Sequence, residues 1–109
     1  MGEAARAADG AGDPQPCCPY FHEAVELVGR RWSGAIISVL IDQEPLRFGE
    51  LAKAVPQISD RMLTERVAEL QRRGIVRRDN GAYALTPMGR DLEPAVEALQ
   101  RWGRRWLSG

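Results

Sequence analysis

The sequence has little of what enzymes and metal-binding proteins use. Its 109 residues include two cysteines and one histidine. Cys17 and Cys18 are adjacent and His22 stands alone, so the chain offers neither a disulfide framework nor the four ligands of a usual zinc site. It also has no Ser-His-Asp arrangement and no glycine-rich loop of the kind that binds phosphate. We therefore expect no enzyme activity, no bound metal and no cofactor.

Long apolar segments are also missing. The apolar steps at 35–37 and 39–41 are far shorter than the roughly 18 residues that a bilayer-spanning helix requires, and the N-terminus lacks the basic and apolar regions of a secretory signal. We therefore expect no membrane partner and a cytoplasmic location. The length allows one core, so we expect a single domain over 17–109. A tail over 1–16, rich in alanine, glycine and aspartate, is expected to be disordered.

An excess of charge of either sign is absent too. Fifteen basic and fifteen acidic residues give a formal net charge of zero. The charges are nevertheless segregated, because six arginines lie between 61 and 78 against two acids, Glu65 and Glu69. Such a cluster can bind phosphate, although a GC-rich genome produces the same preference for arginine over lysine. The neutral total favours instead a module that binds another protein, so charge alone leaves both function classes open.

Two amphipathic segments in the middle of the chain predict a helix-turn-helix. The first spans 48–55 and directs four apolar residues inward: Phe48, Leu51, Ala52 and Val55. The second begins at Ser59, a favourable N-cap residue, and ends before Gly74, which is typical of a helix C-terminus. The turn over 56–58 that joins them has three residues, as helix-turn-helix units do.

A β-hairpin is expected directly after the second of these helices. Two short strands, 75–79 and 82–86, flank Asn80-Gly81, and this pair favours a two-residue hairpin turn because both positions accept a positive φ. Leu46-Arg47 predicts one further, minimal strand. The sequence therefore predicts a mainly α fold with a small β-hairpin wing, that is, a winged helix-turn-helix.

Three further helices are expected around this unit. The first covers 19–28, and the next is capped by Ser33 and runs to about Ile41. The second of them is apolar nearly all round, so we expect it at the centre of the core. The last helix begins at Thr86-Pro87, a cap followed by a first-turn proline, and Pro94 should kink or interrupt it.

The first and last helices carry apolar faces that a small monomer would leave exposed. We therefore expect these faces to form the interface of a homodimer. A winged helix-turn-helix that binds a symmetric DNA site does so as a two-fold dimer. The expected interface residues are apolar side chains at helical spacing on these two helices: Phe21, Val25, Leu99, Trp102 and Trp106. The alternative is that the last helix packs on the first helix of its own domain.

Several separated motifs together resemble a known family. They are, in chain order, Cys18-Pro19, 29–33 (Gly-Arg-Arg-Trp-Ser), 46–51 (Leu-Arg-Phe-Gly-Glu-Leu), Ile58-Ser59 with Leu63-Thr64, Leu70 with 74–76 (Gly-Ile-Val), and 83–90 (Tyr-Ala-Leu-Thr-Pro-Met-Gly-Arg). Over residues 17–107 the chain resembles the HxlR family of bacterial winged-helix transcription regulators. The resemblance implies a homodimer built from the first and last helices and bound to a palindromic operator. It also implies sensing of quinones, aldehydes or oxidants through the cysteine before the first helix, as in several members.

The residues expected to contact DNA come from the second helix of the helix-turn-helix, from the wing and from its flank. Ser59 lies where a recognition helix first meets bases or phosphates. Arg61 suits guanine O6 and N7, Thr64 a thymine methyl group, and Glu65 the amino group of cytosine. The expected phosphate contacts are three arginines outside that helix: Arg47, Arg77 and Arg78. The alternative for each of these residues is an ordinary solvated side chain.

Cys18 is the expected sensor residue. It precedes Pro19 at the start of the first helix, where the positive end of the helix dipole favours the reactive thiolate. The alternative is that both cysteines are inert parts of the tail. Two other functions stay open: a winged-helix module that binds a protein, and a regulator that binds a lipophilic ligand non-covalently between the helices near Trp32, Trp102 and Trp106.

Overall fold

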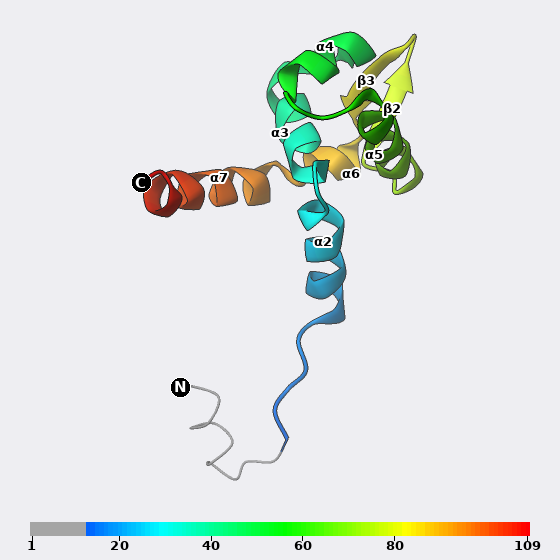
Figure 1. Cartoon of the computed structure of the whole chain (residues 1–109). Helices are drawn as coiled ribbons and strands as arrows, with labels where there is room; N and C mark the ends of the chain where they lie inside the picture. The colour runs from blue at the N-terminus through cyan, green and yellow to red at the C-terminus, as the bar shows by residue number, and fades with distance from the viewer. Residues whose placement is uncertain (1–12) are drawn as a thin grey trace.

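The computed structural model describes residues 13–109 and has the predicted winged helix-turn-helix architecture (Figure 1). Its elements in chain order are α2 (Pro19–Gly29), α3 (Ser33–Gln43), β1 (Leu46–Arg47), α4 (Phe48–Ala54), α5 (Asp60–Arg72), β2 (Val76–Asp79), β3 (Ala82–Leu85), α6 (Pro87–Arg90) and α7 (Glu93–Leu107). Of the tail expected to be disordered over 1–16, residues 1–12 lie outside the described residues. Residues 13–18 belong to no helix or strand. None of the helices described over 13–109 combines the length and the hydropathy that a bilayer crossing requires.

The core is built around α3, as predicted. Ile36, Ile37 and Leu40 have no exposed surface, and α2, α4, α5, α7 and β3 all contact this helix. Leu51 of α4 and Leu63 of α5 are equally buried against it. Burial of these side chains therefore fixes the helix-turn-helix on α3.

The predicted cap of α3 is wrong by one residue. Trp32 occupies the N-cap position with a left-handed φ of 76°, and Ser33 is already the first helical residue, 2% exposed and without a capping hydrogen bond. The helix therefore begins at a residue that already lies in the domain interior. The Ser33 side chain is thereby buried and does not bond to the free N–H groups of the first turn.

The two ends of α5 follow the sequence prediction. At its start, the N–H of Met62 donates to Ser59 Oγ at 3.0 Å. At its end, Gly74 has a φ of 79°, and the N–H groups of Gly74 and Ile75 donate to the carbonyls of Gln71 and Leu70. This pair of bonds is a Schellman motif, which requires the left-handed conformation that glycine adopts at little cost.

The wing is a three-stranded antiparallel sheet in the order β1-β3-β2. Asn80 and Gly81 have φ values of 51° and 81°, which are the values of the predicted type I′ turn. Arg78 pairs with Tyr83 across the hairpin, and Arg47 of β1 pairs with Ala82. The minimal strand predicted at 46–47 therefore completes the sheet.

The C-terminal segment consists of two helices. Thr86 caps α6 by accepting a hydrogen bond from the N–H of Gly89 at 3.0 Å. The predicted interruption is present, but it lies at 91–92, because Pro94 falls in the first turn of α7, where a proline has no N–H to lose.

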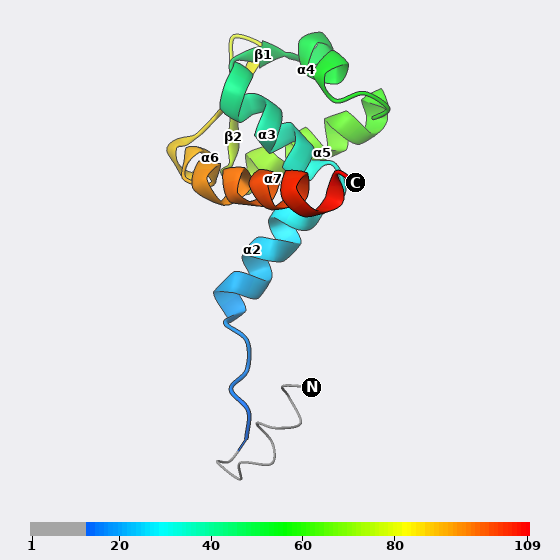
Figure 2. The ribbon, with the colours of Figure 1, turned by 90° about the vertical axis from the view of Figure 1, so that its left-hand side faces the viewer.

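Two helices, α2 and α7, extend from the rest of the domain in different directions (Figures 1 and 2). In α2 no residue is buried, and in α7 Val96 alone is buried. Leu99 and Trp106 of α7 are each 63% exposed. Packing of α7 on α2 of the same chain, the alternative to a dimer, is therefore not what the structure shows.

Candidate nucleic-acid interface

The N-terminal half of α5 presents the four predicted contact residues on one exposed surface. The Arg61 side chain is 90% exposed, and its Nε donates to the carboxylate of Glu65 at 3.3 Å. The hydroxyl of Thr64 donates to the carbonyl of Asp60 at 2.8 Å, so its methyl group is what remains for a contact. Ser59 Oγ is engaged as the helix cap. Arg61 is thus a highly exposed side chain of this set, and its partner Glu65 is 49% exposed.

The wing carries its arginines on both faces. Neighbouring residues of a strand point to opposite sides, so Arg77 and Arg78 do not form one patch. The Arg78 guanidinium lies over the ring of Tyr83, 5.3 Å from its centroid, whereas Arg77 pairs with Asp79. The Arg47 guanidinium lies close to Gly81 at the wing tip. A Cβ atom added to Gly81 would lie only 2.8 Å from Arg47 Nη1.

The basic surface is smaller than the sequence indicates. Of the six arginines between 61 and 78, one is largely withdrawn from solvent and another pairs with a different helix while staying exposed. Arg66 is 11% exposed and donates to Glu69 at 2.9 Å, and Arg73 pairs with Glu23 of α2 at 3.2 Å. The arginines exposed to solvent in this region, and so able to reach phosphate, are therefore Arg61, Arg72, Arg73, Arg77 and Arg78.

Glu69 is a structural residue that the sequence analysis did not single out. Its two carboxylate oxygens accept from Arg66 and from Arg30, which follows α2, at 2.9 and 3.0 Å. The spacing of three between Arg66 and Glu69 is a helical ion-pair signal, but nothing in the sequence brings Arg30 to them. The pair of contacts joins the end of α2 to the middle of α5.

The other predicted site residues lie on the two projecting helices. Exposed apolar side chains gather there: Phe21, Val25, Leu99, Trp102 and Trp106. Cys18 occupies the N-cap position of α2, and it and Cys17 are exposed free thiols. An apolar groove of about 270 Å³ lies between α2 and α6, where Tyr20, Leu27 and Met88 contribute to its wall. The three tryptophans named for a lipophilic ligand do not line this groove.

A helix-turn-helix with an exposed arginine on its second helix, followed by an arginine-bearing wing, defines the class of winged-helix DNA-binding proteins. The comparisons with known proteins agree. The family model described as HxlR-like helix-turn-helix matches residues 27–109. The chain therefore belongs to this family and is a DNA-binding transcriptional regulator.

Individual relatives cover most of the chain. The HTH-type transcriptional regulator YodB of Bacillus subtilis is 39% identical over 92 residues, which are 78% of this chain and 81% of YodB. The uncharacterized regulator YvaP of the same organism is 34% identical over 97 residues, covering 83% of this chain and 89% of YvaP.

Solved structures show the same similarity. The quinone-bound form of YodB superimposes with a TM-score of 0.75 at 40% identity, over 82% of this chain and 100% of that chain. The redox regulator HypR in its reduced form gives 0.72 at 34%, over 78% of this chain and 90% of that chain.

Two glutamates of α5 provide a matched test of the buried ion pair. The Nε of Arg66 is buried without a hydrogen-bond partner among the described residues, so the bond from Arg66 Nη1 to Glu69 offsets much of the cost of burying the guanidinium. We expect Glu69→Gln to lower the free energy of unfolding by about 1–3 kcal/mol. The same change at Glu65, whose pair is exposed, should cost no more than about 0.5 kcal/mol. Urea unfolding measures both, and equal losses would contradict the structural role of Glu69.

Proposed function

We propose that this chain is a homodimeric regulator that binds a palindromic operator with α5 of each protomer in the major groove. The observation that carries the proposal is the separation of two surfaces. The exposed half of α5 is polar and bears Arg61, while the apolar side chains that remain exposed are concentrated on α2 and α7. Such a division suits a protein that binds DNA with one surface and its own copy with another. As a regulator that binds DNA, the chain is also proposed to act in the cytoplasm.

Arg61 is the expected base-specific contact. Its ion pair with Glu65 is exposed, and exposed pairs of this kind are worth only about 0–1 kcal/mol, so the guanidinium can leave Glu65 for guanine at little cost. Glu65 is then free to accept from cytosine, and the Thr64 methyl can contact thymine. The phosphate contacts expected at the wing come from Arg47, Arg77 and Arg78. Ser59, the N-cap of α5, is expected to direct the first turn of that helix toward the DNA backbone.

The DNA contacts are tested by two arginine substitutions. Arg61→Ala should cost about 1–3 kcal/mol on the specific site and relax the preference at one base position, because a bidentate contact to a base is lost. Arg78→Ala should weaken binding to specific and random DNA alike. It should also make the slope of log binding constant against log salt concentration shallower by about one unit. Binding titrations at several salt concentrations, on a site selected from a random pool, measure both.

Arg101→Ala is the control, since Arg101 is an exposed residue of α7 with no ion pair among the described residues. If both variants lose the same affinity for specific and for random DNA, Arg61 contacts a phosphate and not a base. If neither variant changes binding, a module that binds a protein through this surface is the better description.

The dimer is tested on α7. Replacing Leu99 and Trp106 together by serine removes two large apolar side chains from the proposed interface, and an obligate dimer without them should dissociate or unfold. Sedimentation velocity should show monomers at concentrations where the wild type is dimeric. Met88→Ser is the matched control, because Met88 is 58% exposed but lies on α6. A double variant that sediments as the wild-type dimer would place the interface elsewhere.

We further propose that Cys18 senses electrophiles or oxidants. The exposed thiol at the start of α2 supports this role, and the related YodB and HypR have been solved in quinone-bound and oxidised forms respectively. Addition of the thiolate to a quinone forms one S–C bond and, after proton uptake, leaves a hydroquinone thioether. Because α2 is part of the proposed dimer interface, a group added at its first turn would rotate one protomer against the other.

The sensor is tested by comparing the two cysteines. Operator affinity of the wild type and of Cys17→Ser should fall after mild quinone or diamide treatment, whereas Cys18→Ser should keep its affinity, because the reactive thiol is absent. Cys17→Ser is the matched control, because Cys17 is the neighbouring residue and its thiol is also exposed. If all three proteins keep their affinity while mass spectrometry shows modified Cys18, the chain is no thiol switch, and a non-covalent ligand in the α2–α6 groove becomes the better explanation.

A further inference from the structure

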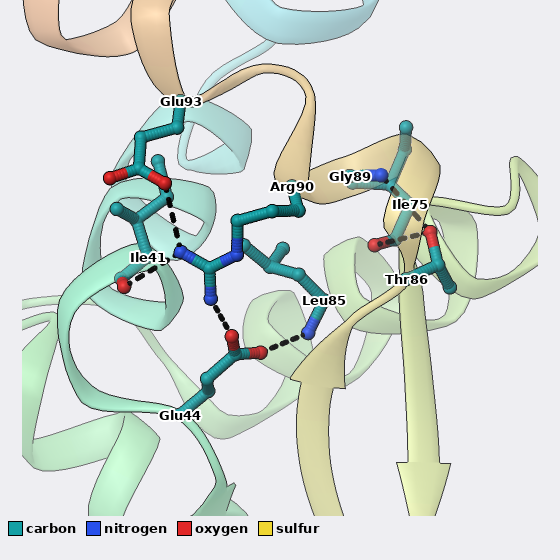
Figure 3. A network of polar contacts seen from close by, with 8 residues as sticks. All are labelled: Ile41, Glu44, Ile75, Leu85, Thr86, Gly89, Arg90 and Glu93. Carbon is teal, nitrogen blue, oxygen red and sulfur yellow. Dashed lines mark hydrogen bonds and ion pairs between the residues drawn. The ribbon is translucent and has the colours of Figure 1, made fainter.

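Arg90 joins three elements at the base of α7 (Figure 3). Its Nη1 donates to the carbonyl of Ile41 and to Glu93 Oε1, both at 3.1 Å, and its Nη2 pairs with the carboxylate of Glu44. The other oxygen of Glu44 accepts from the N–H of Leu85 at 2.6 Å. One guanidinium thus connects the last turn of α3, the end of β3 and the first turn of α7.

A second polar contact holds α7 further along its length. Gln100 Nε2 donates to Ser38 Oγ of α3 at 2.7 Å, and both side chains are partly buried. Between the two contacts, Val96 of α7 is 7% exposed and belongs to the core. Glu93, Val96 and Gln100 are spaced by three and four residues, so they share one face of the helix. This face is attached to the domain at three points over two turns.

The direction of α7 matters because its other apolar residues remain exposed. Leu99, Trp102 and Trp106 are the α7 residues of the proposed dimer interface, and the present inference rests on that proposal. A helix of fifteen residues is about 22 Å long, so a tilt of about 10° moves its far end by about 4 Å. That is close to one base-pair step of about 3.4 Å. Small changes in the direction of α7 would therefore change the distance between the two recognition helices.

We propose that the Arg90–Glu93 and Gln100–Ser38 contacts are positioning contacts that set the half-site spacing of the operator. Apolar packing of Val96 alone is not directional, whereas hydrogen bonds fix orientation as well as distance. The four side chains lie on α3, α6 and α7, apart from the exposed half of α5 and from the three apolar residues of α7 named above. They act on spacing through the direction of α7.

The experiment measures affinity against half-site spacing. The operator is taken from selection of bound DNA from a random pool, and its half-sites are moved apart or together in single base-pair steps. The wild type should prefer one spacing. Gln100→Ala and Ser38→Ala should each reduce the preference for it over its neighbours by about two- to tenfold, the factor that one hydrogen bond is worth. The double variant should go no further than either single variant, because both remove the same bond.

Glu93→Gln tests the contact at the base of the helix and should flatten the spacing profile in the same way. Arg101→Ala, next to Gln100 and exposed, should keep the wild-type profile. Sedimentation and melting temperature are measured for each variant, and Gln100→Asn, whose side chain is too short to reach Ser38, replaces Gln100→Ala if that protein is unfolded.

The outcomes separate this inference from the proposed function. Folded, dimeric variants that keep the wild-type spacing preference would overturn the positioning role and leave the proposed dimer intact. A wild type without any preferred spacing would overturn the dimeric function and, with it, the inference that rests on it. A merely structural role would lower the melting temperature or the affinity at every spacing alike, and that result too would count against the proposal.

Discussion

The burial of α3 is the constraint on which the rest of the structure depends. Ile36, Ile37 and Leu40 are fully enclosed, and burying each such side chain is worth about 1.5–3 kcal/mol. The helices and strand that enclose them also carry the surfaces of the proposed function, since α5 bears the exposed Arg61 and α7 the exposed apolar face. Both surfaces are therefore placed relative to the same helix, and a shift of one element against α3 changes the geometry of the others.

Polar contacts at the edges of this core supply the directions that apolar packing leaves undetermined. Glu69 joins the residue after α2 to α5, and Arg90 joins α3, β3 and α7. Each lies between elements that are distant in sequence, and each is only partly exposed. The same requirement explains why Arg66 is taken out of the basic surface. The charges of α5 thus divide between those that hold the helix in place and those that face solvent, where the proposed DNA contact would be made.

The parts of the fold that were predicted correctly have signals within a few residues. The Ser59 cap, the Gly74 helix end and the Asn80-Gly81 turn follow from local backbone preferences, and periodicity placed Arg61 on the exposed side of α5. The missed features depend on distant partners: Arg30 lies 39 residues from Glu69, and Ser38 lies 62 residues from Gln100. Sequence periodicity shows which charges are on a surface, but it does not show which of them another element will neutralise.

The absence of any buried residue in α2 would make the abundance of the protein a second input to the proposed Cys18 switch. Eleven residues form only a marginal helix in water without tertiary support. Contacts with α3 and the Arg73–Glu23 pair support α2 within the chain, and the proposed partner would add to that support. At concentrations below the dissociation constant of the proposed dimer, α2 would lose that added support, and Cys18 would no longer lie beside an interface. A cell that makes few copies would then hold a regulator that neither occupies its operator nor answers an electrophile, and sensing would begin only above a threshold of expression.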